Sequence, residues 1–184
     1  MRRGRRYGWS RRSWLLGTAA MASERRVLDA DDTKGPLDIA WVQHGHRQSP
    51  AGVRQLVHTV RLFDPWPVRR LRHRGFVHLF LDVEGHRSLR EERAVWITYR
   101  KGRLRAQLMH YSAEPPTVMR RVPLWRPDRR TLKIAFRKRA LGRGRFEAYG
   151  WSAISFVEER DSSCDRRGGC HDSAPEAGYV RHRL

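Results

Sequence analysis

Aspartates cluster near the start of the chain, and one more lies near its end. They flank the Gly35-Pro36 turn or follow the C-terminal cysteines, and are Asp29, Asp31, Asp32, Asp38 and Asp172. Carboxylate oxygens are the hard ligands that calcium prefers, so the pattern predicts a calcium site to which both ends of the chain contribute. The alternative is that these aspartates form Asx-type turns and stay in water. The sequence alone slightly favours this alternative.

Two histidines in His44-Gly45-His46 are spaced so that both imidazoles lie on one face of an extended segment. Cupin-type metal sites use this spacing, but the matching carboxylate is missing and Arg47 would repel a cation. We therefore assign no metal to these histidines and expect them at the solvated end of a strand.

The cysteines Cys164 and Cys170 enclose Asp-Arg-Arg-Gly-Gly. In an oxidising compartment, an even and closely spaced pair near a terminus is most simply a disulfide. A metal site with His171 as third ligand is the alternative, but the second Cys or His pair of a zinc site is absent. The sequence favours the disulfide.

Tryptophans occur throughout the region that we expect to form strands. Trp96 and Trp125 are placed where they would face outward, and exposed aromatic rings on a sheet stack on sugars or on single-stranded nucleic acid. We take them as candidate ligand-binding residues. The alternative, which holds for most tryptophans of a sandwich, is that they fill its core.

Catalytic patterns are weak. Gly150-Trp151-Ser152-Ala153-Ile154 lacks the closing glycine of a nucleophile elbow. The pairs Glu91-Glu92 and Glu158-Glu159 would point apart in an extended chain, whereas a glycosidase needs two converging carboxylates. We predict that the protein is not an enzyme and name no catalytic residue.

The elements that position these side chains are short segments in which every second residue is apolar. This period of two is typical of strands with one face on a core. They are residues 37–43, 55–63, 76–83, 94–100, 104–110, 117–123, 131–137 and 146–157. We expect 76–83 to be central, 94–100 and 104–110 to form a hairpin at Lys101-Gly102, and 117–123 to pair with 131–137. Only 68–73 and 137–141 suit a helical turn. The pattern predicts an all-β fold, a single two-sheet antiparallel sandwich of jelly-roll or immunoglobulin-like type.

Residues 1–22 differ from the rest. Six arginines precede an apolar stretch that ends at Ala20-Met21-Ala22, which is the layout of a secretory signal, and Ser10-Arg11-Arg12 resembles a twin-arginine signal. A flexible basic arm is the alternative. We divide the chain into this leader, a polar entry segment at 23–33 and a sandwich domain at 34–184 with a C-terminal cysteine loop. We expect no transmembrane segment in the mature chain.

The net charge is +20 and comes from 35 arginines and only 4 lysines among the basic residues. An excess of arginine this large is typical of a GC-rich genome, so it is weak evidence for a nucleic-acid partner. Removal of residues 1–22 lowers the net charge to +14, because the segment holds six arginines and no acidic residue. The remaining charge still attracts anionic polymers without sequence preference.

The ends of the domain resemble a known group. The opening Asp31-Asp32-Thr33-Lys34-Gly35-Pro36-Leu37-Asp38-Ile39, the cysteine loop, and the closing Asp172-Ser173-Ala174-Pro175 and Gly178-Tyr179-Val180-Arg181-His182 resemble uncharacterised secreted β-sandwich proteins of high-GC bacteria. More distantly, they are similar to jelly-roll carbohydrate-binding modules. The resemblance implies export and a sandwich, and it implies no activity.

These observations predict an exported, noncatalytic binding or surface domain, secreted or at the cell surface. Its expected partner is a cell-envelope glycan or an anionic envelope polymer, with weak and salt-sensitive binding to nucleic acid. The alternative is an intracellular, arginine-rich nucleic-acid-binding protein. No cofactor is expected apart from the calcium considered above.

Overall fold

The computed structural model describes residues 25–33, 35–72, 74–83, 93–110, 115–142, 147–158 and 169–184, and these residues form strands and two short 3-10 turns. The predicted leader lies outside them. The strands are β1 (Arg25–Leu28), β2 (Ile39–Gln48), β3 (Arg54–Leu62), β4 (Phe76–Asp82), β5 (Arg93–Arg100), β6 (Arg103–His110), β7 (Thr117–Val122), β8 (Leu124–Trp125), β9 (Thr131–Phe136), β10 (Ala148–Val157), β11 (Cys170–Ala174) and β12 (Val180–Arg183). Among the described residues, no helix is long and apolar enough to cross a membrane.

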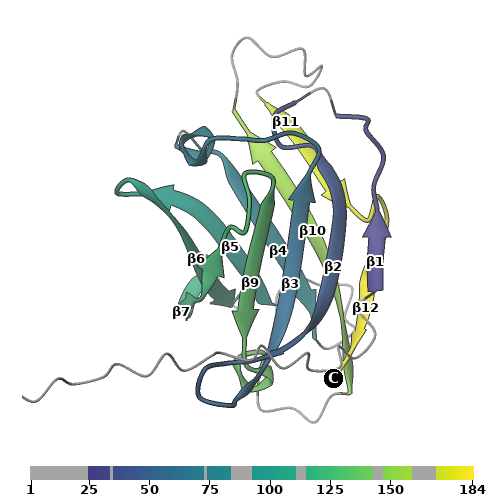
Figure 1. Ribbon diagram of the computed structural model, residues 1–184, viewed down its shortest axis with the longest axis vertical. Coiled ribbons are helices and arrows are strands. Elements are labelled where there is room, and N and C mark those ends of the chain that lie inside the picture. The colour runs from purple at the N-terminus through teal and green to yellow at the C-terminus, as the bar shows by residue number, and fades with distance from the viewer. Residues whose placement is uncertain are drawn as a thin grey trace, which may run out of the picture.

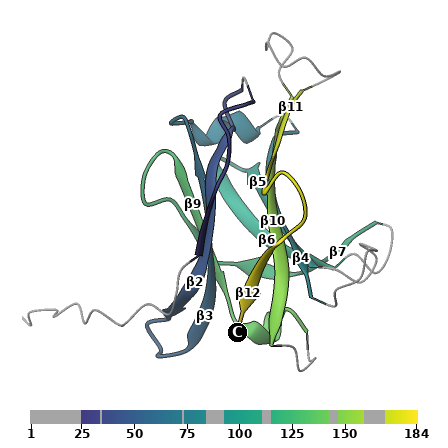
Figure 2. The ribbon, with the colours of Figure 1, turned by 90° about the vertical axis from the view of Figure 1, so that its right-hand side faces the viewer.

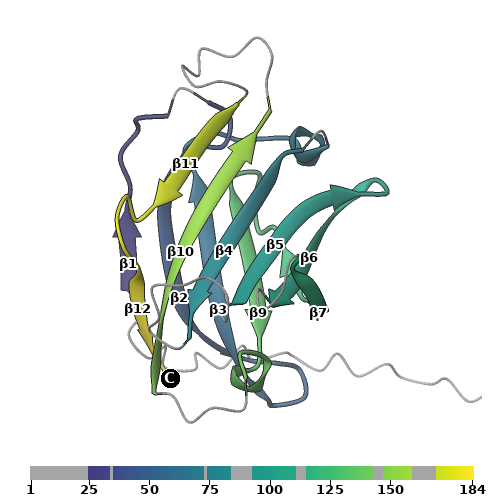
Figure 3. The same ribbon diagram turned by 180° about the vertical axis from the view of Figure 1, so that it is seen from behind.

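Two antiparallel sheets pack face to face, as the edge view in Figure 2 shows. One has the strand order β1-β2-β3-β9-β8, and the other has the order β11-β10-β4-β5-β6-β7, with β12 also paired to β10. Figure 1 looks onto the first sheet and Figure 3 onto the second. The predicted all-β sandwich is therefore confirmed.

Alternation along the strands builds the core between the sheets. In β4, Val77, Leu79 and Leu81 are at most 1% exposed, whereas Phe76 and Phe80, on the other face of the strand, are half-buried. The opposite sheet contributes residues such as Val60 from β3 and Ile134 from β9. Burial of these apolar surfaces is the main stabilising contribution to a fold of this kind.

Several predicted elements are confirmed. β4 lies inside its sheet, between β10 and β5. β5 and β6 form the expected hairpin, with Lys101 and Gly102 at φ of 49° and 80°, the left-handed region that such turns need. The two segments that suit helical turns form the 3-10 turns η1 (Val68–Leu71) and η3 (Lys138–Ala140).

The expected pairing of 117–123 with 131–137 is wrong. β7 pairs with β6 in the larger sheet, and β9 pairs with β3 and β8 in the smaller one. The chain passes from one sheet to the other at Pro123, which has no N–H to donate to a ladder. The carbonyl of Pro123 instead accepts a hydrogen bond from the Ala135 N–H, at 3.1 Å.

Both polar ends of the domain contain strands that the apolar pattern does not indicate. β1 lies in the polar entry segment and pairs with β2, and β11 and β12 lie in the polar tail and pair with β10. The side chains that β11 buries include Cys170 and Asp172. An inward face made of small and polar side chains leaves no hydrophobic period to recognise.

Candidate functional sites

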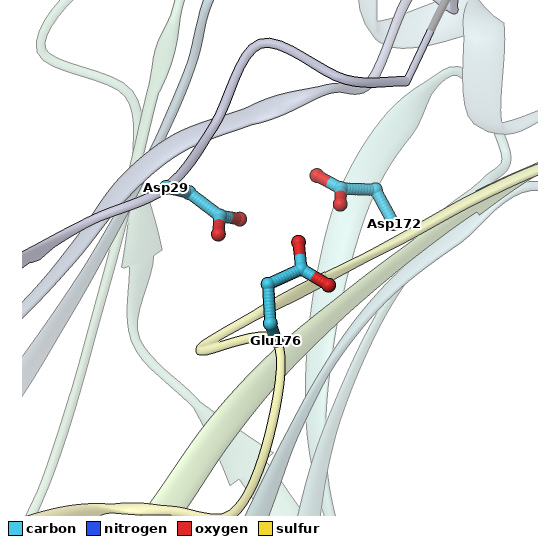
Figure 4. Close-up of side chains that lie close together, drawn as sticks. All are labelled: Asp29, Asp172 and Glu176. Carbon is cyan, nitrogen blue, oxygen red and sulfur yellow. The ribbon is translucent and has the colours of Figure 1, made fainter.

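Carboxylates from the two ends of the chain converge near the edge of the sandwich. Asp29, Asp172 and Glu176 each offer an oxygen, and these oxygens lie within 4.8 Å of one another. Figure 4 shows the three side chains pointing toward a common centre. Asp32, Asp38 and Asp172 form a second group by the same criterion, so Asp172 belongs to both. We call these five residues the carboxylate cluster.

Hydrogen bonds between side chains and backbone groups fix this arrangement. Oδ2 of Asp172 accepts a hydrogen bond of 2.6 Å from the Ile39 N–H, and Oδ1 accepts one of 2.7 Å from the Ser173 N–H. Nearby, the Ser155 hydroxyl of β10 donates to the Leu37 carbonyl at 2.6 Å. The segment before β2 is thereby held against β10 and β11.

Burial and mutual repulsion make the carboxylate cluster electrostatically costly. Burial raises the pKa of Asp29 to about 7, and the charge on Asp172 adds to the shift. Burial also raises the pKa of Asp38 to about 7, with Asp172 and then Asp31 as further causes. The pKa of Asp172 itself is raised, again chiefly by burial. At neutral pH Asp29 and Asp38 therefore lie close to their titration midpoints.

Four of the five aspartates predicted from the sequence lie in the carboxylate cluster. Asp29, Asp32, Asp38 and Asp172 are in the carboxylate cluster, and Asp31 lies close enough to Asp38 to affect its pKa. Glu176 was not predicted, because its position in the turn after β11 is meaningful only once β11 is known. The fold brings these carboxylates together, and calcium binding remains a prediction.

A second feature is a basic pocket of about 480 Å³ at the edge where β1 and β12 approach each other (Figures 1 and 2). Its lining comprises four arginines, three histidines and one leucine: Arg25, Arg54, Arg181, Arg183, His44, His46, His182 and Leu184. None of the described residues that line it is acidic. We call this the basic pocket.

Behind the basic pocket, a polar network runs into the core. The Tyr149 hydroxyl lies 2.7 Å from Nε2 of His58 and 2.7 Å from Nδ1 of His182, so it donates to one ring and accepts from the other. The His182 ring stacks on His44 with centroids 4.0 Å apart. His44 accepts a hydrogen bond of 3.2 Å from Nε1 of Trp151.

The histidines of this network are neutral at physiological pH. Burial, followed by the neighbouring His46 and Arg25, lowers the pKa of His44 to about 4. Burial, followed by His44 and His46, lowers the pKa of His182 to about 3. Complete burial holds the pKa of His58 well below its usual value. Nε2 of His46 and Nε2 of His182 are buried without a hydrogen-bond partner.

The expectation that His44-Gly45-His46 is a solvated strand end is wrong. β2 continues to Gln48, and its alternation turns His44 and His46 inward, where His44 is only 6% exposed. The sequence did contain a signal for the network, because His58 shares one strand face with the apolar residues Leu56, Val60 and Leu62. His182 and the pocket arginines of β12 had no such signal, since β12 was not predicted.

The two candidate tryptophans lie on different sheets. Trp96 is on β5, half-buried on the outer face, and its ring stacks on His78 at a centroid distance of 4.7 Å and an angle of 8°. Trp125 is on β8, also half-buried, with the Arg47 guanidinium 4.2 Å from the centre of its ring. They therefore do not form one shared platform, and ligand stacking on either ring stays a prediction.

Two sequence predictions concern cysteine and serine. Cys170 is buried at the start of β11, whereas Cys164 lies outside the described residues, so the bridge between them remains a prediction. Ser152 lies within β10, as expected, and not on a strand-to-helix turn.

Comparisons with protein-family models, with curated proteins and with solved structures found no match. The resemblance to secreted β-sandwich proteins therefore remains an expectation from the sequence.

Proposed function

We propose that this protein is an exported, noncatalytic binding domain for an anionic polymer of the cell envelope, and that the polymer binds at the basic pocket. The lining of the pocket is the observation that carries the proposal. Guanidinium groups pair with phosphate and carboxylate through two parallel hydrogen bonds, which favours an anionic ligand over a neutral one.

The charges around the basic pocket support this choice of ligand. Arg25, Arg54, Arg181 and Arg183 are exposed, and within the described residues none of them forms an ion pair. The unpartnered ring nitrogens of His46 and His182 lie behind them. An anionic group in the pocket would gain several charge-assisted hydrogen bonds without first displacing an acidic side chain.

Purified cell walls that carry phosphodiester polymers are the probe for this proposal. The double variant Arg54→Ala/Arg181→Ala should bind them at least about tenfold more weakly than the wild type, since charge-assisted hydrogen bonds contribute about 1.5–3 kcal/mol each. The matched control is Arg120→Ala/Arg139→Ala, which removes two exposed arginines outside the pocket lining. Equal losses in both variants would mean that net charge, and not the pocket, determines binding.

Duplex DNA in the same assay tests the intracellular alternative. Contacts between arginine and phosphate release counterions, so nonspecific binding to DNA should disappear at about half-molar salt. Retention of DNA at that salt concentration, together with loss of the cell walls, would favour a specific nucleic-acid-binding protein.

Export has its own test. The arginine-rich start and Ala20-Met21-Ala22 support cleavage before Ser23. N-terminal sequencing of protein from a native culture should give Ser23 as the first residue. Intact Met1 inside the cell would contradict export.

A further inference from the structure

The carboxylate cluster carries an inference that goes beyond the basic pocket. The chain has 39 lysines and arginines against 19 aspartates and glutamates, so an acidic side chain would ordinarily have a basic neighbour. Within the described residues, however, the ion pairs join Arg61 to Asp128 and Arg74 to Glu158, and none involves the carboxylate cluster. Grouped carboxylates repel one another, and no ion pair between described residues offsets that repulsion.

A second observation is independent of this clustering. Asp38 is only 4% exposed, and its buried Oδ1 has no hydrogen-bond partner. Oδ2 of Asp29 is also buried without a partner. A buried polar atom without a partner is costly, and native proteins rarely retain one. Asp38 belongs to the group with Asp32 and Asp172, so one of its carboxylate oxygens lies within 4.8 Å of an oxygen of each of them.

The geometry agrees with one class of ligand. The oxygens of each group lie within 4.8 Å of one another, which is about twice the Ca–O distance of roughly 2.4 Å. Oxygens on opposite sides of one calcium ion are separated by about this distance. Calcium accepts six to eight oxygens in irregular arrangements, whereas magnesium requires a near-ideal octahedron and zinc prefers nitrogen and sulfur.

We propose that the carboxylate cluster binds calcium, with Asp172 as the central ligand and Asp29, Asp32, Asp38 and Glu176 around it. The aspartates at 29, 32 and 38 come from the segment that leads into β2, and Asp172 and Glu176 come from β11 and the turn after it. The ion therefore joins the N-terminal part of the smaller sheet to the C-terminal part of the larger one. It is a structural site at which both ends of the domain meet.

Calorimetric titration of the full-length, EDTA-treated protein tests this proposal directly. Calcium chloride should bind and raise the melting temperature, and magnesium chloride should bind at least about tenfold more weakly. Asp29→Asn and Asp32→Asn should each reduce the calcium affinity at least about tenfold, because each removes one charged ligand. Asp172→Asn should abolish binding, since Asp172 belongs to both groups.

Asp64→Asn is the matched control, because it removes one exposed carboxylate elsewhere on the surface. It should bind calcium as the wild type does. Asp172 also accepts a hydrogen bond from the Ile39 N–H, so loss of calcium binding in Asp172→Asn is informative only if its circular dichroism spectrum is that of the wild type. If the spectrum changes, the calcium affinities of Asp29→Asn and Asp32→Asn test the proposal instead. The proposal is wrong if the wild type binds no calcium at millimolar concentrations, if magnesium binds equally well, or if Asp64→Asn weakens binding as much as Asp29→Asn does.

Discussion

Asp172 on β11 accepts a hydrogen bond of 2.6 Å from the backbone N–H of Ile39, where β2 begins in the opposite sheet. Both residues are buried, and 133 positions separate them in the sequence. In a sandwich the two sheets share apolar contacts but no ladder, so a direct polar contact between them fixes how one sheet is placed on the other.

Replacement of Asp172 should show how much this contact stabilises the fold. Asp172→Ala leaves the buried Ile39 N–H without an acceptor, which costs about 1–3 kcal/mol. Asp172→Asn keeps an oxygen that can accept and removes one charge from the carboxylate cluster, so it should cost much less. Urea denaturation of both variants in EDTA measures the difference. Equal losses would show that the carbonyl oxygen of asparagine does not replace the carboxylate.

The buried histidines predict a loss of stability in acid. The pKa values of His44 and His182 are about 4 and about 3, against about 6.5 in the unfolded chain. Between these values the unfolded chain binds more protons than the native protein. The contribution of these histidines to the free energy of unfolding therefore falls as the pH falls below 6.5, by up to about 1.4 kcal/mol per pH unit for each histidine.

His44→Gln isolates part of this effect. Glutamine can still accept a hydrogen bond from Nε1 of Trp151 but does not titrate, so stability should depend less steeply on pH between about pH 7 and pH 5. The raised pKa values in the carboxylate cluster change stability in the opposite direction, and the comparison of variant with wild type cancels that contribution. Identical slopes by urea denaturation would contradict a neutral, buried His44.

Strands whose inward residues are large and apolar can be predicted from the sequence. β3, β4, β5 and β9 each have such a face, and period-two alternation locates them. The same alternation does not indicate β11 and β12, because they bury polar residues such as Asp172 and His182. In the sequence, polar residues at these positions suggest a solvated tail. The aspartates of the carboxylate cluster were recognised by residue type alone, since turn residues and hard oxygen ligands do not depend on the sheet order. The basic pocket could not be predicted without the strand order, because β1 and β12 approach each other only in the folded chain.

Trp96 and Trp125 predict a salt-resistant component of glycan binding. Stacking of a sugar on an aromatic ring depends on apolar contact, so it should survive about half-molar salt, where the Debye length is about 4 Å. Retention on insoluble cell-wall polysaccharide at that salt should fall in Trp96→Ala and in Trp125→Ala. Tyr179→Ala, which removes an aromatic ring that is 45% exposed just before β12, is the control. Unchanged retention in both tryptophan variants would exclude stacking at these rings.

The predicted bridge between Cys164 and Cys170 should stabilise the edge of the sandwich without determining the fold. It would close a short loop, for which the chain-entropy relation gives about 2–3 kcal/mol. Cys170 opens β11, and the double Cys→Ser variant should therefore lower the free energy of unfolding by about that amount while keeping the β-sheet circular dichroism spectrum. Nonreducing mass spectrometry of the exported protein should find no free thiol. Two free thiols would contradict the bridge, and loss of the β-sheet spectrum in the variant would contradict its peripheral role, because Asp172 and the apolar core should hold the two sheets together without it.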